Sequence, residues 1–281
     1  MRWIIAGIVV SVSLVAAGPL QDAQKLYSRT DYQGALKVLL PLEQKDAKVW
    51  ALVGQSHFMS TDYKKAVEAF EKATTLEPRN SEYVHWLGRA WGRRAETANP
   101  LMAPSCASKA RQYFERAVML DSGNKEALND LFDYYLEAPG FLGGGLNRAE
   151  ALVQRIGALD AAEGHYAAAQ LADKRKEFDK AEESLRRALE LAPRQVGRVI
   201  DLAAYLSKRG RVQESEAAWL QAEKLAPNSP RVLYERAHTY IRDNRNLSMA
   251  RDLLRKYISS PLTPDDPPRS AAEELLRKAG A

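Results

Sequence analysis

A glycine cluster is the first feature of the sequence that suggests chemistry, because Glu137–Ala151 reads EAPGFLGGGLNRAEA. Backbone N–H groups at the start of a helix favour anions, so glycines at such a place can hold a phosphate. A Walker-type phosphate loop requires GxxxxGK[ST], and neither the lysine nor the hydroxyl residue follows Gly140 at that spacing. The dinucleotide pattern GxGxxG is also absent. We therefore interpret the glycines as a turn between two helices.

Two hydrophobic residues, Phe141 and Leu142, lie inside this glycine turn. We expect both side chains to fold back as a hydrophobic plug between the flanking helices. The alternative is that the loop is exposed and contacts a partner through them.

The residue types used in catalysis and metal binding show no matching pattern. The sequence has no HExxH, no CxxC, no pair of histidines four residues apart and no GxSxG. The single cysteine, Cys106, has no histidine near it in the chain to activate it, and we expect a tolerated thiol in a loop. We expect His57 to be packed in the core. The sequence therefore predicts no enzymatic activity, no metal and no cofactor.

Composition and charge narrow the class of protein further. The 281 residues are 46% hydrophobic and 27% charged, as in ordinary soluble domains. The net charge is +5, with 41 basic and 36 acidic residues interspersed. Nucleic-acid binders usually carry a concentrated basic stripe, so we expect no nucleic-acid partner.

The N-terminus differs from the rest of the chain. One arginine precedes an uncharged apolar run from Trp3 to Ala17, and small residues follow at a cleavage position. This pattern is typical of a secretory signal peptide over residues 1–17, and it predicts a periplasmic or secreted protein. A membrane span needs about twenty apolar residues. The alternative is an uncleaved inner-membrane anchor over residues 3–17, which is the only membrane contact we expect.

Small and aromatic residues recur at fixed spacing after this segment. In Val49–Pro78, six residues match the tetratricopeptide pattern: Trp50, Gly54, Ala66, Phe70, Ala73 and Pro78. The stretch thereby resembles the tetratricopeptide repeat family, whose unit is a helix–turn–helix of 34 residues. The spacing itself agrees, because Trp50, Gly54 and His57 fall on one face of a helix. Asp62 stands where the second helix would begin and is a suitable N-cap.

The same frame continues along the chain, since Pro193 and Pro227 close units that are 34 residues apart. We expect about seven repeats over residues 18–262, then a proline-rich segment and a capping helix over residues 263–281. The resemblance implies an all-α, right-handed superhelical solenoid of helix–turn–helix repeats. Terminal caps with a polar outer face keep such stacks soluble.

Two repeats are longer than the unit requires. Ten extra residues lie between Gly88 and Ala110, near 95–106, and five lie between Phe132 and Ala149, at 139–145. We expect loops at both places, because insertions in solenoids usually form loops on one face. The combination also resembles a group of exported bacterial tetratricopeptide proteins that share an APGxxGG-type loop. That resemblance implies fold and export, and no reaction.

The resemblance also implies that a partner binds on the concave surface, which the first helix of each repeat lines. Arg89 and Arg93 lie one turn apart and are expected to face Asn129 of the next repeat, where they would grip a carboxylate or an extended peptide. For His85 and His238 the alternative is a lone surface histidine. The candidate residues of this groove are His85, Arg89, Arg93, Asn129, Asp133, Tyr166, Gln170, Tyr234, His238 and Arg242.

These observations predict a non-catalytic scaffold in the cell envelope that binds a protein or peptide through its concave groove. Two alternatives remain open. One is an enzyme or small-ligand binder that uses the insertion loops. The other is a self-associating structural component, which would form homo-oligomers.

Overall fold

The computed structural model describes residues 18–280, and all of its regular structure in that range is helical. The signal peptide expected over residues 1–17 lies outside the described residues. The helices are α1 (Pro19–Ser28), α2 (Tyr32–Leu39), α3 (Ala47–Met59), α4 (Tyr63–Leu76), α5 (Ser81–Thr97), α6 (Ala103–Leu120), α7 (Lys125–Glu137), η1 (Gly140–Leu142), α8 (Leu146–Leu159), α9 (Ala161–Lys174), α10 (Phe178–Leu191), α11 (Val196–Lys208), α12 (Val212–Leu225), α13 (Pro230–Arg242), α14 (Leu247–Ser259) and α15 (Arg269–Lys278). Between residues 18 and 280, every helix is too short or too polar to cross a membrane.

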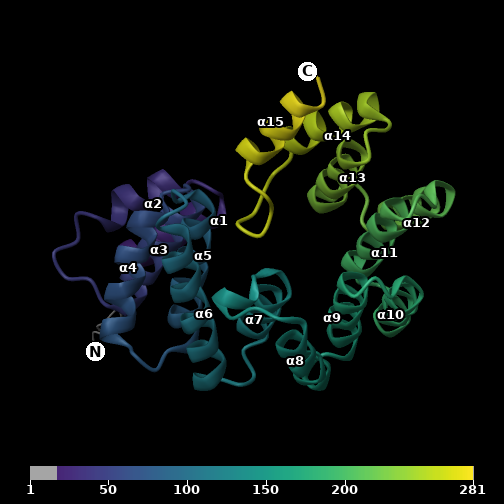
Figure 1. The fold of residues 1–281 in the computed structure, drawn as a ribbon. Helices are drawn as coiled ribbons and strands as arrows, with labels where there is room; N and C mark the ends of the chain where they lie inside the picture. The colour runs from purple at the N-terminus through teal and green to yellow at the C-terminus, as the bar shows by residue number, and fades with distance from the viewer. Residues whose placement is uncertain (1–17, 281) are drawn as a thin grey trace, which may run out of the picture.

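The helices form seven hairpins that stack into a curved solenoid, from α1–α2 to α13–α14, with α15 packed on the last hairpin (Figure 1). First helices of neighbouring hairpins contact each other, as α3 does with α5, α5 with α7 and α11 with α13. These first helices therefore line the inner side of the curve, and the second helices lie outside it. The prediction of an all-α solenoid of helical hairpins is confirmed.

Glycine sets the distance between the two helices of a hairpin. A Cβ added at Gly54 would lie 2.8 Å from the ring of Phe70, which is fully buried. One repeat later, a Cβ at Gly88 would lie 2.7 Å from the ring of Phe114. Asp62 caps α4 as predicted, because its side chain accepts a hydrogen bond from the backbone N–H of Lys65 at 3.3 Å. Close helix packing and capping together explain why this repeat folds as a hairpin.

The core follows the repeat pattern along the solenoid. The predicted inward residues Ala66, Phe70 and Ala73 are all fully buried. His57, which we expected in the core, is 8% exposed and is therefore packed. In α15, Ala272 is buried against the last hairpin while most other residues of the helix are exposed, as a terminal cap requires.

The first insertion is not a loop, so that prediction was wrong. Compared with α3 and α4, the insertion adds four residues to each of α5 and α6 and only two to their connection. Asn99 and Pro100 lie in the short connection between α5 and α6. Pro104 stands in the first turn of α6, where proline is compatible with a helix. Cys106, predicted in a loop, lies in the added turn of α6 and is 2% exposed.

The second insertion is a loop, as predicted, and fills residues 138–145 between α7 and α8. Gly143 and Gly145 have positive φ angles of 87° and 147°, which glycine adopts without strain. A Cβ at Gly144 would lie 1.8 Å from the carbonyl oxygen of Ala138. The glycines are therefore needed for the backbone path of this loop.

The expected hydrophobic plug does not form, because Phe141 is 81% exposed. The loop is closed by its own backbone instead. Gly144 N–H donates to the carbonyl of Pro139 at 3.2 Å, and Gly145 N–H donates to that of Tyr135 at 2.8 Å. Leu142 is half-buried, and its carbonyl accepts a hydrogen bond from the hydroxyl of Tyr134 at 2.9 Å. This close backbone packing leaves the Phe141 ring in solvent.

Candidate functional site

A cavity of about 350 Å³ opens on the inner side of the solenoid between α3, α5, α6 and α7. Its walls are mainly apolar, and charged side chains stand among them. Ala95 and Glu96 belong to the extra turn that the first insertion adds to α5, so the insertion helps to build the cavity. The lining residues are Phe58, Arg89, Gly92, Arg93, Ala95, Glu96, Ala107, Ala110, Phe114, Asp130 and Tyr134.

Arg89 is held in place at this cavity by aromatic rings and a carboxylate. Its guanidinium lies 4.3 Å from the centre of the Trp86 ring and 5.3 Å from that of Phe58. Its Nε is 3.6 Å from Oδ2 of Asp130 on the next repeat. The side chain is still 38% exposed. Arg89 can therefore offer N–H groups to a ligand without first being ordered.

Arg93 lines the same cavity one turn further along α5. Its Nε and Nη2 both donate to the hydroxyl of Tyr63 at 3.3 Å, and it pairs with Glu96. Burial lowers the pKa of Arg93, but the hydrogen bonds to Tyr63 and the pairing with Glu96 together raise it further above its already high value. The two arginines expected to act together are thus side by side at one cavity.

His85 is not a surface residue, contrary to the alternative offered for it. It is 4% exposed, its ring lies 5.9 Å from that of Phe114, and its Nε2 donates to Oδ2 of Asp130 at 2.7 Å. Sequence reasoning missed Asp130, which stands one residue after Asn129. A repeat frame that also considered the sixth position of each first helix would have found it.

Asn129 does not face the arginines as expected. Its Nδ2 donates to Oε1 of Glu163 on the following repeat at 3.3 Å, and Asp130 is the residue of α7 that contacts Arg89. The reason is geometric. Adjacent residues of a helix point about 100° apart, so Asn129 and Asp130 turn toward opposite neighbours along the solenoid.

Carboxylates gather on the groove side of α7 and α9. Asp133 is exposed at the surface of α7, and the charges of Asp130, Glu137 and Glu163 act on it. Burial first, and then these carboxylates, raise the pKa of Asp133 to about 6. Asp130 lies beside Arg89, Glu137 pairs with Lys174 and Glu163 pairs with Arg198. Asp133 is therefore the carboxylate of this group that a bound cation would stabilise.

A second cavity of about 310 Å³ lies between α9, α11 and α13. Tyr166 and Gln170, both expected in the groove, line it and are joined by a hydrogen bond of 3.2 Å between Gln170 Nε2 and the Tyr166 hydroxyl. Asp201 also lines it, and burial raises the pKa of this carboxyl to about 6 although Arg198 lowers it. Asp201 again occupies the sixth position of its repeat and was missed for the same reason as Asp130.

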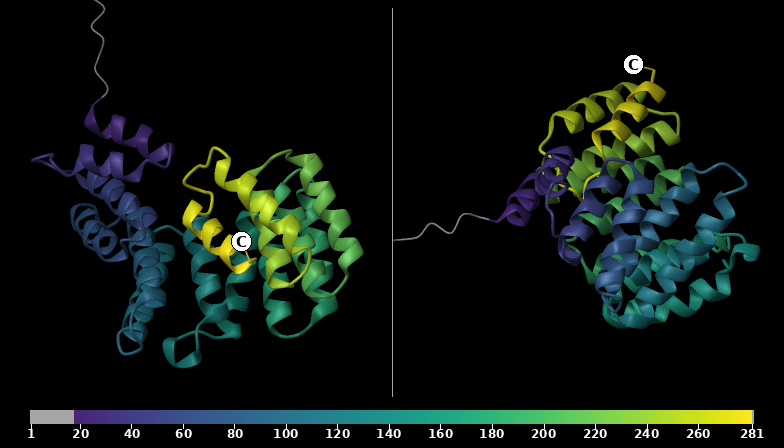
Figure 2. Two further views of the ribbon diagram at one scale, coloured as in Figure 1. Left: turned by 90° about the horizontal axis from the view of Figure 1, so that it is seen from above. Right: turned by 90° about the vertical axis from the view of Figure 1, so that its left-hand side faces the viewer.

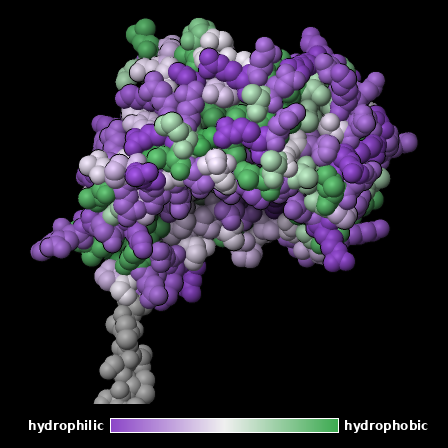
Figure 3. All heavy atoms as spheres, turned by 90° about the horizontal axis from the view of Figure 1, so that it is seen from below, coloured by the Kyte–Doolittle hydropathy of each residue, from purple (hydrophilic) through white to green (hydrophobic). Residues whose placement is uncertain are grey.

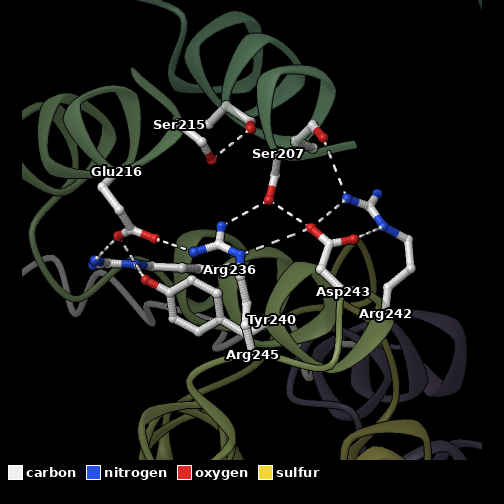
Figure 4. Close-up of polar contacts among 10 residues, drawn as sticks. Ser207, Ser215, Glu216, Arg236, Tyr240, Arg242, Asp243 and Arg245 are labelled. Carbon is white, nitrogen blue, oxygen red and sulfur yellow. Dashed lines mark hydrogen bonds and ion pairs between the residues drawn. The ribbon is translucent and has the colours of Figure 1, made fainter. Parts of the chain in front are cut away.

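The last three expected residues, on α13, contact neighbouring side chains. The rings of Tyr234 and His238 stack with centres 6.3 Å apart. Arg242 donates through Nε to Asp243 at 2.7 Å and through Nη2 to the carbonyl of Ala204 at 3.3 Å (Figure 4). Arg242 thereby ties α13 to α11.

The surrounding network in Figure 4 joins the last two hairpins. Glu216 of α12 accepts hydrogen bonds from Arg236, Tyr240 and Arg245 at 2.9, 2.7 and 2.8 Å. Ser207 links this group to Asp243, donating at 2.5 Å. The charges are thus paired within the protein, so this network is structural.

Over residues 18–280, no three His, Cys, Asp or Glu side chains converge as metal ligands would.

Comparison with known proteins identifies the repeat. The sequence profile described as "Tetratricopeptide repeat" matches residues 47–80 and 162–195. No curated protein is significantly similar to the chain in sequence.

Solved structures of tetratricopeptide repeat (TPR) proteins have the same fold. One from Parabacteroides merdae is 13% identical, with a TM-score of 0.62 over 94% of this chain and 98% of its own. A thermophilic TPR protein from Thermus thermophilus is 20% identical, with a TM-score of 0.54 over 67% and 97%. A chain of the APC/C Cut9–Hcn1 hetero-tetramer is 15% identical, with a TM-score of 0.51 over 93% and 48%. At such identities the likeness concerns the fold alone. The chain therefore carries tetratricopeptide repeats and has the fold of a tetratricopeptide repeat protein.

Proposed function

We propose that the protein is a non-catalytic scaffold that binds an extended segment of a partner protein along its concave groove. Tetratricopeptide repeats generally mediate protein–protein interactions, which supports the general class. The observation that carries the proposal is the cavity beside Arg89 and Arg93, because its apolar walls are open to solvent and its arginines are already ordered.

The size and chemistry of this cavity suit one large apolar side chain. Phe58 and Phe114 supply aromatic walls, and Ala107 and Ala110 keep the space between them open. Burial of a leucine- or phenylalanine-sized side chain contributes about 1.5–3 kcal/mol. The N–H groups of Arg89 would then bind a backbone carbonyl or a carboxylate of the same segment.

The neighbouring carboxylates set the charge of the segment next to this anchor. Glu137 pairs with Lys174 and Glu163 pairs with Arg198, whereas Asp133 has no ion pair among the described residues. A lysine or arginine of the partner would give Asp133 a partner of opposite charge. We therefore propose a segment with an apolar anchor followed by a basic residue.

The sequence of residues 1–17 supports a location for this binding. Their composition supports export to the periplasm or beyond, with an inner-membrane anchor as the alternative. N-terminal sequencing of the protein isolated from its host decides between them. A mature chain beginning at Gly18 supports export with cleavage, whereas an intact N-terminus supports the anchor.

Gly92 offers a direct way to fill the cavity. A Cβ added there would meet only Ala110, at an ordinary distance of 3.8 Å. Gly92→Leu should therefore fold and occupy the cavity, and Gly92→Ala is the matched control. Affinity capture from envelope extracts with both variants tests the proposal, which fails if Gly92→Leu retains the same proteins as Gly92→Ala.

A second candidate function, self-association, is favoured by the tips of the two lengthened hairpins. Leu101 is 92% exposed and Phe141 is 81% exposed. Both connections project toward one edge of the solenoid (Figure 2, left). On the face drawn in Figure 3, hydrophobic residues lie only in small groups among hydrophilic ones. Sedimentation of the double variant Leu101→Ser/Phe141→Ser and of the wild type tests this candidate. A dimeric wild type and a monomeric variant would support self-association, whereas a monomeric wild type would contradict it.

A further inference from the structure

The C-terminal part of the chain returns to the first repeat. The segment Leu262–Pro268, which we call the latch, joins α14 to α15 and lies near the turn between α1 and α2 (Figures 1 and 2). Just after it, Nη1 of Arg269 donates to Oγ1 of Thr30 at 3.5 Å. Residues that are 239 positions apart thereby come within hydrogen-bonding distance, and the two ends of the solenoid lie next to each other.

The latch is firmly attached to the C-terminal hairpin. The hydroxyl of Tyr257 donates to the carbonyl of Pro267. Arg269 donates to the carbonyls of Ile258 and Ser260 at 3.1 and 3.0 Å. Leu262 is 7% exposed and packs in the last hydrophobic cluster. The latch is therefore expected to move together with the C-terminal hairpin.

The latch is also stiff in itself. Oδ2 of Asp266 accepts hydrogen bonds from the backbone N–H and the hydroxyl of Thr263, at 2.9 and 3.0 Å. Pro264, Pro267 and Pro268 fix further backbone angles. The segment is therefore a preformed turn whose shape does not depend on the first repeat.

Contact with the first repeat is much weaker. The hydrogen bond between Arg269 and Thr30 is long, and a cavity of about 180 Å³ separates Thr30 and Tyr32 from the latch. A joint that is poorly packed on one side and rigid on the other separates at the poorly packed side. The two ends should therefore separate between the latch and the α1–α2 turn.

The latch also extends into the groove. Asp265 lines a cavity of about 640 Å³ together with His85, Trp86 and Arg89. Arg89 lines this cavity and the apolar one described above. The latch therefore stands over the end of the groove at which Arg89 lies.

We propose that the latch is a gate, which bridges the last hairpin and the first repeat and hinders a bulky partner segment from reaching the Arg89 end of the groove until the joint at Thr30 opens. Access of a partner segment to Arg89 is the part that rests on the proposed function. Opening itself is independent of any partner.

Opening is measured as a distance in the full chain. Nitroxide labels at Ser28→Cys and Glu273→Cys report on the joint by pulsed electron spin resonance, and buried Cys106 stays unlabelled. We expect a short distance in this background and a longer one after Arg269→Ala. Thr30→Gly should give the same change, since Thr30 has a φ of 62° that suits glycine and the fold is kept. Arg277→Ala is the control. The same distance in all four proteins would overturn the proposal.

Screening is measured by thiol modification. Glu126 is exposed and lines the cavity under the latch, so Glu126→Cys with a bulky maleimide reports access, and Glu190→Cys on the outer face is the control. If the joint is open in about one molecule in ten, Thr30→Gly should raise the Glu126→Cys rate by about tenfold. An equal rate in both backgrounds would overturn the gate. The Gly92→Leu capture decides separately whether the cavity binds a partner.

Discussion

Asp130 of the fourth repeat contacts two residues of the third repeat at once. Its Oδ2 lies 2.7 Å from Nε2 of buried His85 and 3.6 Å from Nε of Arg89. One carboxylate thus satisfies a buried ring nitrogen and orients the arginine that faces the groove. The stability of the repeat interface and the geometry of the candidate site are coupled through this residue.

Substitution of Asp130 should therefore affect both properties. Asp130→Ala leaves the ring nitrogen of His85 without its partner, which costs about 1–3 kcal/mol. Urea unfolding should show this loss, and Asp130→Asn, which keeps an acceptor, should show a smaller one. Asp133→Ala on the same helix is the control and should show no loss of stability, because it removes a carboxylate without leaving a buried group unpaired. Equal stability of Asp130→Ala and the wild type would contradict the role of this contact.

Two glycines on α5 should respond oppositely to the same substitution. Gly88→Ala places a methyl group 2.7 Å from the ring of Phe114 and should destabilise the protein by about 1–3 kcal/mol, as overpacking does. Gly92→Ala meets only Ala110 at 3.8 Å and should stabilise the helix by up to about 1 kcal/mol. Thermal unfolding of the two variants checks the pair, and a shift of the same sign in both would be inconsistent with this packing.

The glycine loop should depend on its backbone and not on its aromatic residue. Gly144→Ala brings a Cβ to 1.8 Å from the carbonyl oxygen of Ala138, so the melting temperature should fall by several degrees. Phe141→Ala should leave it unchanged, because the ring is exposed. A large loss of stability in Phe141→Ala would contradict the exposed position of the ring and support the hydrophobic plug expected from the sequence.

The stability of the protein should depend on pH through Asp133. Its pKa is raised from 3.8 to about 6 in the folded chain, so between these values the folded state binds more protons than the unfolded state. The contribution of Asp133 to the free energy of unfolding therefore falls as pH rises from about 4 to 6. Asp133→Asn should be more stable than the wild type at pH 7, by no more than about 1 kcal/mol because the side chain contacts solvent. NMR titration of the carboxyl gives the pKa, and a value near 4 would refute the crowding of carboxylates.

The hairpins could be predicted from the sequence because they depend on contacts within one repeat. Gly54, Ala66 and Phe70 bring two helices together by local packing, and their spacing is visible in the chain. The same holds for the loop at 138–145, because its glycines are visible in the sequence and Gly143 and Gly145 adopt the positive φ angles of a turn. Interactions between residues that are close in the sequence therefore determine the hairpins and this loop.

The errors concern helix starts and contacts between repeats. The first insertion was expected to form a loop, but Pro104 stands in the first turn of α6, where proline is compatible with the start of a helix. The burial of His85 and the role of Asp130 depend on how the third repeat meets the fourth, and a frame read within one repeat does not contain that relation. The same applies to the latch, since Thr30 and Arg269 meet only through the curvature of the whole solenoid.

The most direct test of the account is the affinity of the two Gly92 variants for the segment recovered by affinity capture, measured by calorimetry with a synthetic peptide. Gly92→Ala should bind it like the wild type. Gly92→Leu fills the cavity and should bind about 30-fold more weakly, the equivalent of ~2 kcal/mol of lost apolar burial. Equal affinity of both variants, with both folded, would contradict binding at the Arg89 cavity.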